Sequence, residues 1–411
     1  MLLNSMTRKL EEFKPFDNKK VKMFTCGPSI YLLPHIGNYR TFLFEDVLYR
    51  YLEYLGYDVE RALNVTDVED KAIAEAQKEG VALKELTERN TKVFLEELHR
   101  LRAKSPTYLL RSSSSVDQAV SIIDALLRKR FAYWYKDSVY FDPTKFKSFG
   151  KLYRLDMNKW PKEKRRFHKD TYPGNRWNLG DFILWHAYKK DDKETYWNTS
   201  LGKGRPAWNI QDAAMATQSL GYKVDIYCGG VDNLIRHHDY SIAIAESLSG
   251  KSFAKLWLHG EHLFVDGKKM SKSRGNIIYP KNLVKHSCQW QHVRFFLING
   301  YYRKRLNYTH RKFEAACNRL QQFKSMVKKL QNTETTSQKS DLRTSKLIAR
   351  LKEEFEDNMN NDLHVKKAFD ALFNNISKLL IMAEKDKVGV HDREKALATL
   401  KSIDQVLQVI S

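Results

Sequence analysis

The segment Lys20–Thr66 decides the fold of this chain. It reads KVKMFTCGPSIYLLPHIGNYRTFLFEDVLYRYLEYLGYDVERALNVT. Its two ends, 20–26 and 58–66, favour short strands. Between them apolar residues recur every three or four positions and Gly56 ends the run, which predicts a helix; these residues are Phe42, Val47, Leu48, Tyr51, Leu52 and Leu55. Strand, helix and strand in succession form the βαβ unit of a parallel sheet, so we expect an α/β fold.

The rest of the chain divides by composition. Residues 83–131 favour helices, interrupted by SPTYLLRSSSS at 105–115. Residues 132–206 are rich in aromatic, turn and charged residues, which indicates an insertion with short strands. After residue 308 an apolar stripe predicts a helix, and more helices follow the polar linker QNTETTSQKS. The predicted division is 1–131 and 207–300 for two halves of an α/β domain, 132–206 for the insertion and 301–411 for an all-helical bundle.

Composition narrows the function classes. The 411 residues carry 71 Lys and Arg against 49 Asp and Glu, a net charge of +22, which favours a polyanionic partner such as nucleic acid. A solvated basic surface is the plainer explanation. Four cysteines without a CxxC spacing favour a reducing, cytoplasmic setting. No apolar run approaches the ~20 residues of a membrane helix, and the first residues do not form a signal peptide.

Two short motifs carry chemistry. HIGN, His35–Asn38, stands at the predicted strand-to-helix junction, where backbone N–H groups favour phosphate and Gly37 lets a ligand approach the backbone. A loop histidine beside glycine is more often structural, so this motif alone is weak. Lys268–Ser273 reads KKMSKS, and three lysines with two hydroxyls can close over a triphosphate. A basic surface turn is the alternative, but five specified residues rarely arise by chance.

HIGN and KMSKS, in this order on a βαβ frame, are the signatures of class I aminoacyl-tRNA synthetases. The chain further resembles the cysteinyl-tRNA synthetase family from about residue 18 to about 410. The resemblance is carried by the stretch from FTCGPS to GYDV and by NVTDVEDK, SVYFDPTKFKSFGKL, DFILW, GKGRPAWNIQDAAM, DIYCGGVDNLIRHH and VRFFLINGYYRKRLNY.

The resemblance implies a Rossmann-like catalytic domain in which ATP, with Mg²⁺, and an amino acid form an aminoacyl adenylate. His35, Gly37 and Asn38 would then hold phosphates and adenosine. Gly229, Gly230 and Asp232 would lie against the adenosine, and Lys269, Ser271 and Lys272 would bind the triphosphate. The amino acid's carboxylate is itself the nucleophile, so positioning and charge stabilisation by His35, Asn38, Lys269 and Lys272 suffice.

The sequence departs from the family at its zinc site. The family holds zinc with a Cys after the first strand, the Cys of WHIEC, and the His and final Glu of HHENE. Here Cys26 and His237 are kept, whereas the second Cys is Asp212 and the Glu is Ser241. Asp is an acceptable zinc ligand, so Cys26, Asp212 and His237 remain a candidate three-ligand set. The alternative is a polar amino-acid pocket without metal.

That pocket is expected to hold the amino-acid side chain. The resemblance places seven residues there: Cys26, Thr66, Trp208, Asp212, Tyr227, His237 and Ser241. An uncompensated Asp212 would favour a positive group on the substrate. Cysteine is the first candidate substrate on resemblance, and a polar or basic amino acid is the second.

The second departure is length, because the family continues into a small anticodon-reading module and this chain ends at Ser411. A shortened paralogue that joins an activated amino acid to a small amine is therefore an alternative, and a non-catalytic tRNA- or nucleotide-binding paralogue is another. A basic face favours tRNA, since cations on one helical face neutralise phosphates. It comprises Arg303, Lys304, Arg305, Arg311, Lys312, Arg319 and Lys324. The insertion PKEKRRFHK at 161–169 is also basic, with solubility as the plain explanation. The family's habit is a monomer.

Overall fold

The computed structural model describes residues 1–156, 180–285, 288–333 and 342–410. The chain's central element is a five-stranded sheet in the order β12-β11-β3-β4-β5, with every neighbouring pair parallel. Its strands are β3 (Lys20–Thr25), β4 (Asp58–Val65), β5 (Tyr108–Arg111), β11 (Val224–Gly230) and β12 (Ala254–Gly260). The expected α/β fold with a Rossmann-like parallel sheet is therefore confirmed.

The predicted βαβ unit is present, with α1 (Ile36–Tyr54) joining β3 to β4. Five of the six predicted apolar residues are buried, as are Leu43 and Phe44, whereas Leu55 caps the C-terminus of the helix and is exposed. The stretch 105–115 that was expected to interrupt the helices contains the strand β5. Two of its four residues, Tyr108 and Leu109, are exposed at the sheet edge.

The segment 132–206 contributes a second, antiparallel sheet in the order β6-β7-β8-β10-β9. Its strands are β6 (Ala132–Tyr135), β7 (Ser138–Phe141), β8 (Phe182–Ala187), β9 (Trp197–Thr199) and β10 (Gly202–Pro206). Its apolar face packs on the helices α4 (Val116–Arg128), α6 (Trp208–Leu220) and α7 (Asp239–Ser249), and forms a core of its own there. The basic stretch 161–169 lies outside the described residues.

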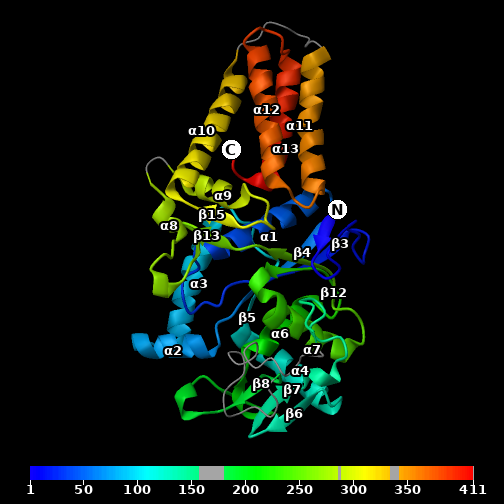
Figure 1. Cartoon of the computed structure of the whole chain (residues 1–411), viewed down its shortest axis with the longest axis vertical. Helices are drawn as coiled ribbons and strands as arrows, with labels where there is room; N and C mark the ends of the chain where they lie inside the picture. Colours follow the sequence, from blue (N-terminus) through cyan, green and yellow to red (C-terminus); the bar gives the residue numbers. More distant parts are fainter. Residues whose placement is uncertain (157–179, 286–287, 334–341, 411) are drawn as a thin grey trace.

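Four long helices form the bundle at the opposite end of the molecule (Figure 1). They are α10 (His310–Asn332), α11 (Leu342–Asn360), α12 (Val365–Ala383) and α13 (Val390–Leu407). The bundle's apolar residues join those of α1, β3 and α9 (Trp290–Ile298) in one continuous core. None of the helices in the described ranges combines the length and the apolar character that a membrane crossing requires.

The remaining helices and strands lie around the central sheet. A hairpin at the N-terminus contains β1 (Leu2–Asn4) and β2 (Lys9–Glu11), while α2 (Asp70–Glu79) and α3 (Leu83–Arg100) follow β4. The strands β13 (Leu263–Val265), β14 (Lys268–Lys269) and β15 (Leu306–Tyr308) form a small sheet, and α8 (Pro280–Leu283) precedes α9. This small sheet carries the KMSKS segment beside the carboxyl ends of the central strands.

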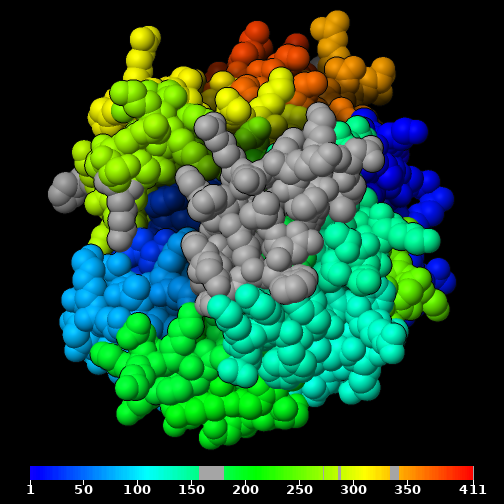
Figure 2. Space-filling view, turned by 60° about the horizontal axis from the view of Figure 1, so that its bottom comes forward, coloured from blue at the N-terminus to red at the C-terminus, as the bar shows by residue number. Residues whose placement is uncertain are grey.

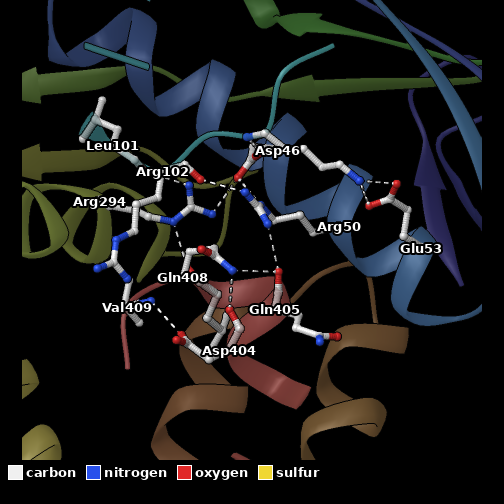
Figure 3. A network of polar contacts seen from close by, with 12 residues as sticks. Asp46, Arg50, Glu53, Leu101, Arg102, Arg294, Asp404, Gln405, Gln408 and Val409 are labelled. Atoms are coloured by element: carbon white, nitrogen blue, oxygen red, sulfur yellow. Dashed lines mark hydrogen bonds and ion pairs between the residues drawn. The ribbon is translucent and has the colours of Figure 1, made fainter. Parts of the chain in front are cut away.

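A buried polar network fastens the bundle to α1 (Figure 3). The Arg294 side chain, fully buried on α9, donates to Asp46 of α1 at 2.6 Å and to the Leu407 carbonyl of α13 at 2.7 Å. Burial alone would raise the pKa of Asp46, but the Arg294 and Arg50 guanidiniums outweigh it and hold that pKa below its usual value. The helix that starts at the HIGN motif is thus tied to the bundle.

Candidate active site

A cavity of about 280 Å³ opens at the carboxyl ends of the central strands. Its walls come from the residues after β3, β4, β11 and β12, from the start of α1, and from Lys269 and Met270. β3 lies between β4 and β11. The carboxyl end of β3 therefore opens on the crevice in which parallel α/β sheets bind their ligands. In Figure 2 the dark-blue early residues lie recessed between the light-blue segment and the yellow-green segment around the KMSKS loop.

The HIGN motif forms the N-terminus of α1. His35 Nδ1 accepts hydrogen bonds from the Gly37 and Asn38 backbone N–H groups, at 3.2 and 3.3 Å, and the Asn38 side chain accepts from His35 N. Burial lowers the pKa of His35, which favours the neutral ring. Because Nδ1 is an acceptor, the ring proton of neutral His35 sits on Nε2. His35 thus offers a donor at the helix terminus, where phosphate oxygens are favoured.

The KMSKS segment meets the HIGN motif at one contact. Lys269 is exposed on β14, and both Lys269 and Met270 line the cavity. A Cβ built on Gly37 would approach the Met270 methyl to 2.8 Å. Ser271 does not line the cavity; its N–H donates to the Asn276 side chain and its hydroxyl lies 3.2 Å from that of Ser273. The Lys272 side chain lies outside the described part of the chain.

The end of β11 forms the opposite wall. Gly230 and the exposed Asp232 line the cavity, while Gly229 is buried behind it. Gly230 N–H donates to the Asn233 side chain at 2.9 Å, which shapes the turn that follows the strand. A Cβ on Gly229 would lie 2.8 Å from the His238 ring, so only glycine leaves room for that histidine. The carboxylate of Asp232 is thus accessible from the cavity.

The expected amino-acid pocket separates into two layers. Cys26, Thr66, Asp212 and His237 line the cavity. Trp208 lies beside His237 with the ring centroids 4.9 Å apart. Tyr227 and Ser241 are fully buried and do not line the cavity. Burial raises the pKa of Tyr227 well above its usual value, with nearby Cys26 and Asp212 adding to the shift, so its phenol stays protonated.

Asp212 is compensated, so the condition under which it would favour a positive group on the substrate is not met. Its Oδ1 accepts from Asn64 Nδ2 at 2.8 Å, and its Oδ2 lies 2.9 Å from His237 Nδ1. Burial opposes charge on His237, but Asp212 outweighs it and raises the pKa of that imidazole. Asn64 in turn accepts from Gly27 N–H at 2.6 Å, which ties the pair to the ends of β3 and β4. Asp212 therefore gives no unpaired charge to a cationic substrate.

The residues present do not fit the family's zinc ion. No group of three or more His, Cys, Asp or Glu side chains is arranged to hold a metal in the ranges that the structure describes. Cys26 Sγ lies 3.0 Å from His238 Nε2, while Asp212 and His237 face each other. The candidate set of Cys26, Asp212 and His237 is therefore not assembled, because each of the three side chains already has a protein partner.

Sequence reasoning missed a buried relay behind Cys26. His238 Nδ1 lies 2.8 Å from His259 Nε2, and His259 Nδ1 lies 2.8 Å from Ser5 Oγ. Burial lowers the pKa of His259 to about 3 and that of His238 well below its usual value, so both rings are neutral. Burial raises the pKa of the Cys26 thiol. The relay orients a protonated thiol, and His238 and His259 are too distant in sequence for any spacing to join them.

Asn64 was also missed, although a signal existed. It is a polar residue at the carboxyl end of a buried strand, the edge where ligands bind in parallel sheets. Asn233, Glu261 and His262 line the cavity from the corresponding positions after β11 and β12.

The basic face is only partly available to RNA. Lys304, Arg305, Arg311 and Lys312 are exposed. The Arg303 side chain, assigned to the same face, pairs with buried Asp362 at 2.7 Å and donates to the Leu3 carbonyl. Arg319 pairs with Asp370 at 2.6 Å over the Phe373 ring, and Lys324 donates to Gln291 at 2.9 Å. These three side chains already have partners within the protein.

Solved structures share this architecture. Mycobacterium tuberculosis methionyl-tRNA synthetase, solved with methionyl-adenylate, aligns over 95% of this chain and 90% of its own with a TM-score of 0.67 and 15% identity. An Agrobacterium radiobacter leucyl-tRNA synthetase, solved in a ternary complex, covers 97% of this chain and 85% of its own with a TM-score of 0.69 and 11% identity. The parallel sheet and the two signature loops meeting over one cavity thus define the fold of a class I aminoacyl-tRNA synthetase.

Sequence comparison specifies the branch. Residues 12–318 match the family described as tRNA synthetases class I (C) catalytic domain. A "Cysteine--tRNA ligase" of Chlamydia pneumoniae is 38% identical, covering 99% of this chain and 85% of its own, and one of Brachyspira hyodysenteriae is 35% identical with the same coverage. The chain belongs to the class I (C) tRNA synthetase family. It is a ligase that activates an amino acid with ATP and transfers it to tRNA.

Proposed function

We propose that the amino acid is cysteine and that the acceptor is tRNA for cysteine. The contact between Gly37 and Met270 carries the proposal, because it brings both phosphate-binding motifs to one cavity that also contains Cys26, Thr66 and His237. Relatives that are named cysteine--tRNA ligases and are similar over nearly the whole chain support the substrate.

Catalysis of this reaction requires that the reactants are held in position and that the charge developing on the phosphates is stabilised. An oxygen of the cysteine carboxylate attacks the α-phosphorus of ATP, the bond to the bridging oxygen breaks, and pyrophosphate leaves. His35 Nε2–H and Lys269 are placed to donate to phosphate oxygens as charge moves to them, while Asp232 binds the ribose. Asn38 acts by fixing His35, since its side chain accepts from the His35 backbone. Ser271 and Lys272 belong to the same loop, Gly230 lies on the cavity wall beside the nucleotide, and Gly229 leaves room for the His238 ring behind that wall.

Mg²⁺ supplies neutralisation of the triphosphate charge when bound. The cavity walls offer the carboxylates of Asp232 and Glu261, which are oxygen donors of the kind that Mg²⁺ prefers. In the second step a ribose hydroxyl at the end of tRNA attacks the adenylate carbonyl and AMP leaves.

We propose that the tRNA stem lies along Lys304, Arg305, Arg311 and Lys312 on the exposed side of the bundle. The proposed organisation is a catalytic domain at 1–131 and 207–300, an insertion at 132–206 and a tRNA-contacting bundle at 301–411, acting as a monomer in the cytoplasm.

Pyrophosphate exchange with single amino acids tests the proposal. We expect ATP-dependent exchange with cysteine, and transfer of labelled cysteine to tRNA that nuclease treatment abolishes. Exchange with none of the twenty amino acids would contradict the adenylation step. Transfer that survives nuclease treatment would instead support ligation to a small amine.

A further inference from the structure

We propose that this enzyme recognises the cysteine thiol without zinc, through the hydrogen-bonded pair of His237 and Asp212 braced by Asn64. The inference rests on the proposed cysteine substrate. It concerns how the side chain is selected, and it follows from the disagreement between the residues present and a metal site.

The first step is that the Asp212 side chain already forms hydrogen bonds with Asn64 and His237. Both Asp212 oxygens have partners, Asn64 at 2.8 Å and His237 at 2.9 Å, and the Asp212 side chain is only 6% exposed. A zinc ion between Asp212 and His237 would have to break their mutual hydrogen bond. Ser241, one turn after His237, lacks a charged ligand atom and is fully buried.

The second step is that Cys26 is committed elsewhere. Its sulfur lies 3.0 Å from His238 Nε2, at the end of the relay through His259 to Ser5. All four residues of this relay are buried. A ligand to zinc would have to be the thiolate, turned away from the relay. Cys26 therefore lines the pocket as a protonated thiol and not as a metal ligand.

The third step is what His237 offers to a substrate. Its Nδ1 faces Asp212, so Nε2 is the nitrogen left for a ligand, and His237 is the exposed member of the pair at 37%. Both His237 and Asp212 line the cavity. An imidazole backed by a carboxylate can accept the thiol proton on Nε2 and hold the resulting thiolate by a charge-assisted hydrogen bond, because a thiol releases its proton far more readily than an alcohol does. Serine, which has the same shape, gains less from this contact.

The fourth step is the aromatic support of the His237 ring. Trp208 lies beside the His237 ring at 4.9 Å, and Trp208 and His237 come from α6 and from the π-helical turn Leu234–His238. Such π turns are frequent at functional sites because the wider turn redirects side chains. Trp208 does not line the cavity itself, so it supports the His237 ring from behind.

Metal analysis of the purified full chain, beside pyrophosphate exchange, tests the inference. We expect substoichiometric zinc, and exchange with cysteine that is unchanged after treatment with a zinc chelator. One zinc per chain, with exchange abolished on its removal and regained with zinc alone, would overturn the inference and leave the proposed function standing. Absence of exchange with every amino acid, with or without added zinc, would overturn the proposed function itself.

Substitutions then identify the residues that recognise the thiol. Asp212→Asn should lower kcat/KM for cysteine about 10- to 100-fold, with the ATP KM unchanged and the preference for cysteine over serine reduced. His237→Gln, at a more exposed position, should show the same pattern and covers the case in which Asp212→Asn fails to fold. Asp232→Asn is the matched comparison: it should raise the ATP KM and leave the cysteine-to-serine ratio intact. An unchanged ratio in His237→Gln would refute recognition by this pair.

Discussion

Gly37 of the HIGN motif and Met270 of the KMSKS motif are in contact across the cavity, and a Cβ on Gly37 would come within 2.8 Å of the Met270 methyl. The same Cβ would lie 3.0 Å from the His35 ring. The glycine therefore lets the two phosphate-binding segments close on each other while His35 keeps its capping position. Gly37 and Met270 are 233 positions apart in the sequence (270 − 37), and their close approach depends on the absence of a side chain on Gly37.

Gly37→Ala should separate the two segments. Because small displacements of catalytic groups are costly, we expect pyrophosphate exchange to fall about 100-fold with little change in the thermal midpoint. The double variant Gly37→Ala with Met270→Ala removes the opposing methyl and should recover part of the activity. No recovery in the double variant would show that the contact with His35 is what matters.

Lys269→Ala should remove a charge that faces the developing pyrophosphate. Lys269 is exposed and lines the cavity, so its loss leaves no buried partner and the fold should be unaffected. We expect kcat for exchange to fall about 100-fold or more, with a smaller change in the KM for cysteine. Lys268→Ala, one residue earlier and not on the cavity wall, is the control and should keep most of the activity.

Asp46→Asn should destabilise the whole molecule. It leaves the buried Arg294 guanidinium without its charged partner, and breaking such a pair costs about 3–5 kcal/mol. Urea unfolding measures the loss. Asp46→Asn combined with Arg294→Met should be less destabilised than the sum of the two single variants, and full additivity would contradict direct coupling.

Glu45 should make stability depend on pH. Its carboxyl is fully buried, neither oxygen has a hydrogen-bond partner in the described part of the chain, and Arg61 lies 3.7 Å away. Burial raises its pKa from 4.5 to about 8, so the folded state keeps a proton that the unfolded chain loses. The stability from this group is thus complete below pH 4.5 and declines as pH rises towards 8, by at most about 1.4 kcal/mol per pH unit.

Glu45→Gln removes that titration. Its unfolding free energy should exceed that of the natural chain most clearly near pH 8 and should approach it near pH 5. Denaturant unfolding at a series of pH values checks this, and parallel curves for the two proteins would refute the assignment.

Arg311→Glu together with Lys312→Glu tests the exposed basic face. Both side chains are exposed at the start of α10, so the fold should persist. We expect the KM for tRNA to rise and the slope of log affinity against log salt to fall by about 1 for each phosphate that is no longer neutralised, while tRNA-independent exchange is unchanged. Arg303→Glu should instead lower stability, because Arg303 is paired with buried Asp362.

Local patterns predicted much of the fold and the nucleotide side of the cavity. The strands at 20–25 and 58–65 and the helix between them depend on apolar periodicity, which a single stretch of sequence displays. HIGN and KMSKS are contiguous, so the sequence alone also indicated the residues beside phosphate. The edge strand β5 was not predicted, because its residues face the solvent as much as the core.

The other side of the cavity could not be predicted in this way. The hydrogen-bond partners of Asp212 could not be inferred, since Asn64 and His237 come from other elements. The relay from Cys26 to Ser5 joins four segments of the chain. Arg303 belongs to a basic run whose letters do not reveal that Asp362 lies against it.

The sequence by itself determined the parallel sheet, the helical bundle and the two phosphate-binding motifs, because these depend on periodicity and on contiguous residues. Only the tertiary structure decided which polar side chains neutralise one another, and with that whether Cys26, Asp212 and His237 form a metal site. Hydrogen bonds and ion pairs act over about 3 Å between groups that folding brings together from distant positions, and sequence spacing carries no record of that proximity.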